Sequence, residues 1–306
     1  MDPSAIKCSY HNSFSPAEAT VTLHSYASSN NSSPRNLIGN SPKDLIEASP
    51  RDLIGNSPNE SEGVSQQEKY DPFENVSPEP FQSRDSLTLA NLDAVFNFSR
   101  HTSGYILQQE DKDFTFVSLH DDGSFLEYLL YRNPNAYGYG YSESKRSTSR
   151  KIKCSNCDNF NTVPADNVPE FIHFMKSVEV VGTDLVISKR DYLNSLLIAL
   201  SVIKIGGTFI SPVNLKSKKE KNLLWITAQC FDRITLLVPI ANPNETYLIA
   251  EGAKVNNTDW ITFISTSNNL RLVSPPESFL QWLNYSVDYS NLNIDTYKCR
   301  AVWNLP

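Results

Sequence analysis

The sequence has few of the features that mark secreted or membrane proteins. Five cysteines among 306 residues, an odd number, are more typical of reduced thiols inside a cell than of a disulfide framework. No segment approaches the ~20 consecutive apolar residues that cross a bilayer, and the start at Met1 shows no basic stretch followed by an apolar run. We therefore expect an intracellular protein, cytoplasmic or nuclear, that is neither secreted nor bound to a membrane.

Excess positive charge is also absent. Lys and Arg together number 27 against 34 Asp and Glu, which gives a formal charge of -7. Any contact with RNA must therefore come from a local basic patch. A composition of 40% apolar and 20% charged residues supports a folded core and excludes collagen-like and coiled-coil proteins.

Residues 1–85 lack tryptophan and hold half of the 18 prolines. Such a segment buries too little apolar area to offset chain entropy, which predicts a disordered tail. Within it, an eight-residue unit of the pattern SP[RK]xLI occurs at residues 33–40, 41–48 and 49–56. The unit is either a regulated docking and phosphorylation site or the product of tandem duplication in an unconstrained tail.

From residue 86 the pattern changes to alternating strands and helices, which predicts crossover units and a mostly parallel sheet covered on both faces. The predicted fold is α/β and doubly wound over residues 86–252, followed by a C-terminal extension, residues 253–306, packed on that domain. Ligands of such sheets bind beyond the carboxyl ends of the strands, which directs attention to the loop at residues 119–124. The predicted strands are residues 113–119, 136–141, 184–188, 207–210, 232–238 and 245–250, and the predicted helices are residues 124–130, 191–203, 218–229 and 277–283.

Five motifs follow one another in the predicted domain. They are LANLDAVF at residues 89–96, FLEYLLYR at 125–132 followed by GYG at 138–140, DLVIS at 184–188, LIALSVIKIGGTFI at 197–210, and NETYLI at 244–249. Together they resemble the FtsJ-like ribose 2′-O-methyltransferases, in particular the cap-ribose methyltransferases of eukaryotes and large DNA viruses. The resemblance implies a Rossmann-like methyltransferase fold, S-adenosylmethionine as cofactor and capped RNA as substrate.

The resemblance also implies a Lys-Asp-Lys-Glu active site, in which lysine charge stabilises the developing alkoxide. Carried over by the motifs, the first lysine falls on Thr88, the aspartate on Lys189 and the central lysine on Pro212. Only Glu245 matches. Since proline has neither charge nor a backbone donor, the central catalytic group is absent, and we predict a degenerate active site.

The loop expected to bind the cofactor departs from the family as well. Where the family has a G-P-G-G turn, this sequence has Asp121, Asp122, Gly123 and Ser124. Two carboxylates then stand where the methionine carboxylate of the cofactor would approach. At an effective dielectric of about 20, like charges ~4 Å apart repel by ~4 kcal/mol, so we expect no cofactor unless a cation intervenes.

Basic residues gather at two places. Lys216, Lys218 and Lys219 follow the Gly-Gly strand, on the rim where the resemblance places RNA, and Lys145 and Arg146 follow the predicted second strand. In an acidic chain, such runs are either phosphate contacts or solvated loops.

Cys154 and Cys157 form a lone CxxC. A structural zinc site needs four ligands, and the sequence offers no second pair nearby. We therefore expect no metal site.

Three hypotheses follow. The first is a catalytically degenerate relative of the cap methyltransferases that binds RNA or a protein partner. The second is an active S-adenosylmethionine-dependent cap 2′-O-methyltransferase that uses Lys189 and Glu245. The third is a structural or assembly protein, viral in type, that kept the fold for its surface and forms an oligomer.

Overall fold

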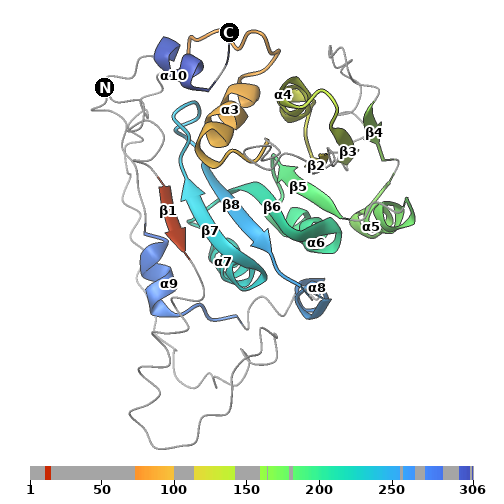
Figure 1. The fold of residues 1–306 in the computed structure, drawn as a ribbon. Helices are drawn as coiled ribbons and strands as arrows, with labels where there is room; N and C mark the ends of the chain where they lie inside the picture. The colour runs from red at the N-terminus through yellow and green to blue at the C-terminus, as the bar shows by residue number, and fades with distance from the viewer. Residues whose placement is uncertain are drawn as a thin grey trace, which may run out of the picture.

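The computed structural model describes residues 11–14, 73–99, 114–141, 159–163, 165–178, 182–255, 258–265, 273–284, 296–303 and 305. In these residues one sheet of eight strands forms the centre of the molecule, with helices on both faces (Figure 1). The strand order across the sheet is β1-β7-β8-β6-β5-β2-β3-β4. The strands are β1 (His11–Phe14), β2 (Thr115–Leu119), β3 (Tyr137–Tyr141), β4 (Phe160–Thr162), β5 (Thr183–Ser188), β6 (Ile203–Val213), β7 (Phe231–Leu237) and β8 (Thr246–Ala253).

The five strands from β4 to β6 are parallel, whereas β8 runs antiparallel to both β6 and β7. From β2 the chain proceeds to β3 and β4 on one side, and β5 and β6 lie on the other side. The strand order therefore reverses between β2 and β5. In doubly wound sheets a ligand crevice opens at this switch point, beyond the carboxyl ends of the two strands.

Two helical layers cover the sheet, and each contains one hydrophobic cluster. Consecutive residues of β5 alternate between them, since Val186 belongs to one cluster and Leu185 and Ile187 to the other. One layer contains α5 (Val168–Ser177), α6 (Tyr192–Val202), α7 (Lys218–Cys230), α8 (Thr258–Ser265) and α9 (Glu277–Trp282), and the other contains α3 (Arg84–Phe96), α4 (Ser124–Arg132) and α10 (Thr296–Val302). The predicted doubly wound α/β fold with a mostly parallel sheet is thus confirmed.

The described parts of the predicted tail contain ordered elements. Strand β1 pairs with β7 at the edge of the sheet, and the side chains of Phe73 and Phe81 are buried in the cluster of α3 and α4. The prediction of disorder was therefore wrong for residues 11–14 and 73–85, because apolar residues spaced along a Ser/Pro-rich segment can still dock on an existing core. The three repeats at residues 33–56 lie outside the described residues. No helix of the described residues is both long and apolar enough to cross a membrane.

Helix α3 carries the first family-like motif and is held by its buried polar side chains. The Oδ1 atom of Asn91 accepts a hydrogen bond from the backbone nitrogen of Ile240 at 2.8 Å. The carboxylate of Asp93 accepts from the hydroxyl of Tyr128 in α4 at 2.7 Å and from the backbone nitrogen of Ser99 at 2.8 Å. These contacts fix α3 against α4 and against the loop between β7 and β8.

We predict that Asn91→Ala lowers the free energy of unfolding by about 1–3 kcal/mol, because the buried amide of Ile240 loses its acceptor. Urea unfolding measures this change. The matched control is Thr88→Val in the same helix, since the buried Thr88 Oγ1 has no hydrogen-bond partner among the described residues. We expect that variant to be neutral or slightly stabilising. Equal losses in the two variants would contradict the role given to Asn91.

Candidate active site

The two loops at the switch point lie side by side because β2 and β5 are paired. Leu119 and Ser188, the last residues of the two strands, are register partners, and the backbone nitrogen of Lys189 donates to the carbonyl oxygen of Leu119 at 3.2 Å. His120 and Asp191 have positive φ angles of 55° and 56°. Both loops thus turn sharply where they leave the sheet.

The loop after β2 ends in a glycine turn that begins α4. Gly123 has a φ of 107°, a conformation that favours glycine, and without a side chain it provides no cap for the helix. Asp121 caps the helix instead: its Oδ2 accepts from the backbone nitrogen of Leu126 at 3.0 Å and its Oδ1 from that of Phe125 at 3.3 Å. The helix N-terminus, where an anionic ligand group would bind, therefore holds a carboxylate of the chain itself.

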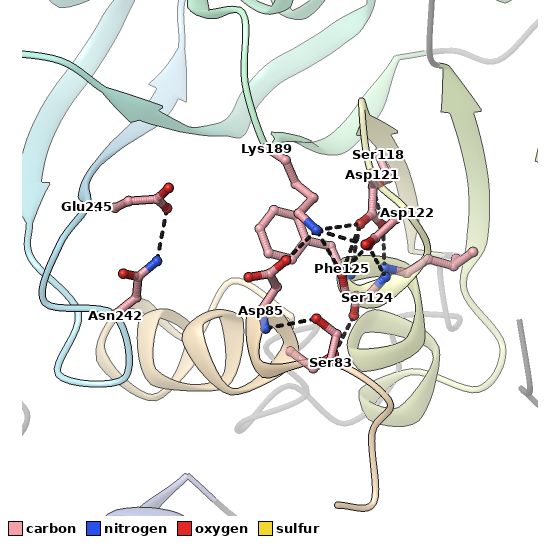
Figure 2. A network of polar contacts seen from close by, with 12 residues as sticks. Ser83, Asp85, Ser118, Asp121, Asp122, Ser124, Phe125, Lys189, Asn242 and Glu245 are labelled. Atoms are coloured by element: carbon pink, nitrogen blue, oxygen red, sulfur yellow. Dashed lines mark hydrogen bonds and ion pairs between the residues drawn. The ribbon is translucent and has the colours of Figure 1, made fainter. Parts of the chain in front are cut away.

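Lys189 extends from the end of β5 into this loop (Figure 2). Its Nζ atom lies 2.9 Å from Asp122 Oδ1, 3.0 Å from Ser124 Oγ and 3.9 Å from Asp121 Oδ1. It also forms an ion pair with Asp85, in the first turn of α3. One ammonium group thus joins three carboxylates from two separate parts of the chain, which we call the Lys189 cluster: Asp85, Asp121, Asp122, Ser124 and Lys189.

Burial and hydrogen bonds shift the pKa values of the Lys189 cluster in opposite directions. Burial raises the pKa of Asp121, and the amides of α4 and the Lys189 ammonium counteract only part of that effect. Burial also opposes the charge of Asp122, but hydrogen bonds from Ser124 and Lys189 outweigh it and lower the pKa of this carboxyl to about 2. Likewise, the carboxylates of Asp85 and Asp122 outweigh burial and raise the pKa of Lys189. Lys189 and Asp122 are therefore both charged at neutral pH.

The Lys189 cluster corrects one expectation. The two loop carboxylates do not stand unpaired, because Lys189 supplies the intervening cation. Lys189 and Glu245, which the active-enzyme hypothesis assigns to catalysis, contact different partners (Figure 2). Asp85 was missed because it lies 104 positions before Lys189, although an acid in the first turn of a helix is a recognisable sequence feature.

The other three positions of the expected tetrad lie on or beside different elements. Thr88 is buried inside α3 at 1% exposure, whereas Pro212 lies in β6. Glu245 is exposed just before β8, where its Oε2 accepts hydrogen bonds from Tyr247 Oη at 2.8 Å and Asn242 Nδ2 at 3.0 Å. Burial and the nearby Glu245 carboxylate raise the pKa of Tyr247 well above its ordinary value, so its hydroxyl stays protonated and donates.

A cleft of about 650 Å³ lies beyond the ends of β5 and β6 and contains Lys189, Pro212 and Glu245 on its walls. Lys216 and Lys219 also line it, and Lys218 is exposed at the start of α7. Lys145, Arg146 and the CxxC pair lie outside the described residues. The cleft therefore has a basic rim on the α7 side, and Pro212, which the motifs align with the family's central lysine, lies on its wall. Its lining is residues 189–193, 212–217, 219, 220, 223 and 244–246.

The seven strands from β4 to β7 have the order β4-β3-β2-β5-β6-β8-β7, with β8 antiparallel between β6 and β7. Comparison with curated proteins finds relatives of this chain. The chain is 25% identical over 249 residues to cap-specific mRNA (nucleoside-2'-O-)-methyltransferase 1 of Drosophila melanogaster, covering 69% of this chain and 32% of the relative. It is 23% identical to inactive cap-specific mRNA (nucleoside-2'-O-)-methyltransferase 1B of Caenorhabditis briggsae, over 60% of this chain and 28% of the relative.

The curated relatives of this chain are thus cap-specific mRNA 2′-O-methyltransferases, which confirms the resemblance seen in the motifs. The chain spans about a third of the length of these relatives. No family model matches it. Among solved structures, an O-methyltransferase family protein from Burkholderia thailandensis aligns with a TM-score of 0.36 and 16% identity over 56% of this chain and 60% of that one.

We predict that Lys189→Met destabilises the chain by roughly 1–2 kcal/mol at pH 7, a value discounted for the partial exposure of Asp85 and Asp122. Because the pKa of Asp122 is lowered in the folded state, its stabilising contribution is present above its ordinary pKa near 3.8 and is lost as the pH falls toward 2. The difference between parent and variant should therefore shrink between pH 5 and pH 2.5.

Urea unfolding at several pH values measures this prediction. The control is Lys204→Met, which removes an ion pair with Asp184 from a lysine whose side chain is 41% exposed. We expect Lys204→Met to lower the free energy of unfolding by less than about 0.5 kcal/mol. A pH-independent loss in Lys189→Met, or one no larger than the control, would contradict the electrostatic account of the Lys189 cluster.

Proposed function

We propose that this chain is a catalytically silent relative of the cap ribose 2′-O-methyltransferases and acts as a binding module for RNA or a protein partner. The observation that carries the proposal is the Lys189 cluster. Asp121 occupies the N-terminus of α4 and the ammonium of Lys189 fills the loop, so the groups that would hold the carboxylate and the ammonium of S-adenosylmethionine are engaged with each other. The residues present do not fit this cofactor.

The absence of the family's central lysine supports the same proposal, because that lysine would act on the hydroxyl of the substrate. A ribose hydroxyl is a very weak acid, and its attack on a methyl group requires a cation to stabilise the alkoxide. Pro212, which the motifs align with that cation, lines the cleft, and Lys189 is held by Asp85 and Asp122. Loss of one such stabilising group costs about 2.7–4 kcal/mol, or two to three orders of magnitude in rate.

The basic rim of the cleft supports RNA as a ligand. Lys216 and Lys219 line the cleft and Lys218 is exposed beside it, and within the described part of the chain these three lysines form no ion pair. An RNA held there would be bound through its phosphates and left unmodified. We also predict that the protein is intracellular, either cytoplasmic or nuclear.

We predict no methyl transfer above background. The assay measures radiolabelled methyl incorporation from S-adenosylmethionine into capped RNA by the unmodified chain. We expect Pro212→Lys to remain equally silent, because the Lys189 cluster is intact in that variant. Saturable incorporation at the ribose 2′ position that Glu245→Ala abolishes would overturn the proposal and establish the active-enzyme alternative.

We predict that replacing Lys216, Lys218 and Lys219 by alanine weakens the binding of capped and uncapped RNA to the same degree. The slope of log affinity against log salt should flatten by up to about three units, one for each phosphate that is no longer neutralised. The matched control replaces Lys176, an exposed lysine on α5, and should leave the slope unchanged. An unchanged slope in the triple variant would assign the three lysines to solvent and favour a protein partner or the structural alternative.

A further inference from the structure

Glu245 is a carboxylate that is held in place on the wall of the cleft. Its Oε2 accepts hydrogen bonds from Tyr247 Oη at 2.8 Å and from Asn242 Nδ2 at 3.0 Å, and Figure 2 shows the second of these contacts. Within the described part of the chain, Glu245 Oε1 forms no hydrogen bond or ion pair, and the residue is exposed. One oxygen of the carboxylate therefore fixes the side chain, and the other is available to a ligand in the cleft.

The sheet places Glu245 next to the basic rim of the cleft. Val213 at the end of β6 pairs with Thr246 at the start of β8, so Asn214 and Glu245 are the next residues beyond this pair. Asn214 begins the turn that leads to α7, and its Oδ1 accepts from the backbone nitrogen of Lys216 at 3.0 Å. The available carboxylate oxygen and the first lysine of the rim therefore come from neighbouring segments.

The acids and the bases of the cleft are engaged differently. Asp191 and Glu220 accept hydrogen bonds from backbone nitrogens at 3.4 Å and 2.6 Å. By contrast, the exposed side chains of Arg190, Lys216 and Lys219 form no ion pair among the described residues. The cleft thus offers three cations to phosphate groups, one from the loop after β5 and two from the segment between β6 and α7.

A carboxylate beside phosphate-binding cations opposes a nucleic acid unless it accepts a hydrogen bond from it. Phosphate oxygens repel the carboxylate, whereas an O–H donor forms a charge-assisted hydrogen bond with it. The ribose 2′-hydroxyl is such a donor, and it is present at every RNA nucleotide whatever the base and absent from DNA. A methyl group on this oxygen removes the donor.

We propose that Glu245 recognises the ribose 2′-hydroxyl of an RNA strand bound in the cleft, so that the chain retains unmethylated RNA and discriminates against DNA and 2′-O-methylated RNA. Arg190, Lys216 and Lys219 neutralise the phosphates of that strand, and Tyr247 is a positioning residue for the carboxylate. The inference rests on the proposed function, since it requires an RNA ligand, and it adds the chemical group that the cleft distinguishes.

The probes are three short fluorescent single strands of one base sequence: RNA, DNA with uracil in place of thymine, and RNA with every ribose 2′-O-methylated. Anisotropy measures their affinities for the full chain. We expect RNA to bind about tenfold more tightly than either of the others, because it alone offers a donor to the carboxylate. If 2′-O-methylated RNA bound as tightly as RNA, the preference would follow the shape of the strand and the proposal would be wrong.

Variants test whether the carboxylate carries the preference. In Glu245→Ala we expect the affinity for DNA to rise about threefold, because repulsion of the phosphates is removed, and the ratio of RNA to DNA affinity to fall close to one. Tyr247→Phe loosens the carboxylate and should lower the ratio about threefold. The matched control is Glu277→Ala, which removes an exposed carboxylate of α9 that does not line the cleft, and it should keep the ratio near tenfold.

Failure of this inference is distinguishable from failure of the proposed function. Equal binding of RNA and DNA by the unmodified chain, or a preference for RNA that persists in Glu245→Ala, overturns the role of Glu245 and leaves RNA binding itself intact. Absence of binding to all three strands overturns both the role of Glu245 and the proposed binding of RNA.

Discussion

The candidate site depends on the ion pairs that the ammonium group of Lys189 forms with the carboxylates of Asp85 and Asp122. Asp121 is buried with its carboxylate on the N-terminus of α4, and Asp122 adjoins it, an arrangement that would be costly without a nearby cation. Lys189 supplies that cation from the adjacent strand and reaches Asp85 on α3 as well. The unusual residues of the two loops therefore compensate each other, and each alone would leave a partly buried charge unpaired.

On the proposed function, structural contacts keep the motifs of a methyltransferase in place beside a silent site. The residues that carry the resemblance are largely those that hold α3 and α4 in place: Asn91 binds the loop before β8, and Asp93 binds Tyr128. Their removal would destabilise the domain. By contrast, the resemblance aligns Pro212 and Thr88 with catalytic positions, and neither side chain carries a charge.

Much of the fold could be predicted from local sequence patterns. The expected strand at residues 184–188 is β5 almost to the residue, and the expected helix at residues 218–229 is α7, because both show clear periodicity. Helix α3 showed no clear periodicity because residues 86–93 are all buried. Strand β6 was predicted too short, at residues 207–210, because residue 203 was assigned to the preceding helix and residues 204–206 and 211–213 were left unassigned. The motifs alone predicted the substitutions at the tetrad positions. The direction of the Lys189 side chain could not be predicted, because its partner Asp85 is distant in sequence and contacts it only after α3 docks.

Whether the Lys189 cluster occupies the place of the cofactor can be measured by calorimetric titration of the purified full chain with S-adenosylmethionine. The same titration of Lys189→Met records what the ammonium contributes. We expect no saturable heat for the unmodified chain up to millimolar cofactor, since neither the α4 amides nor the loop carboxylates are available. Saturable binding at micromolar concentration by the unmodified chain, with one cofactor per chain, would show that the cluster leaves the cofactor site open.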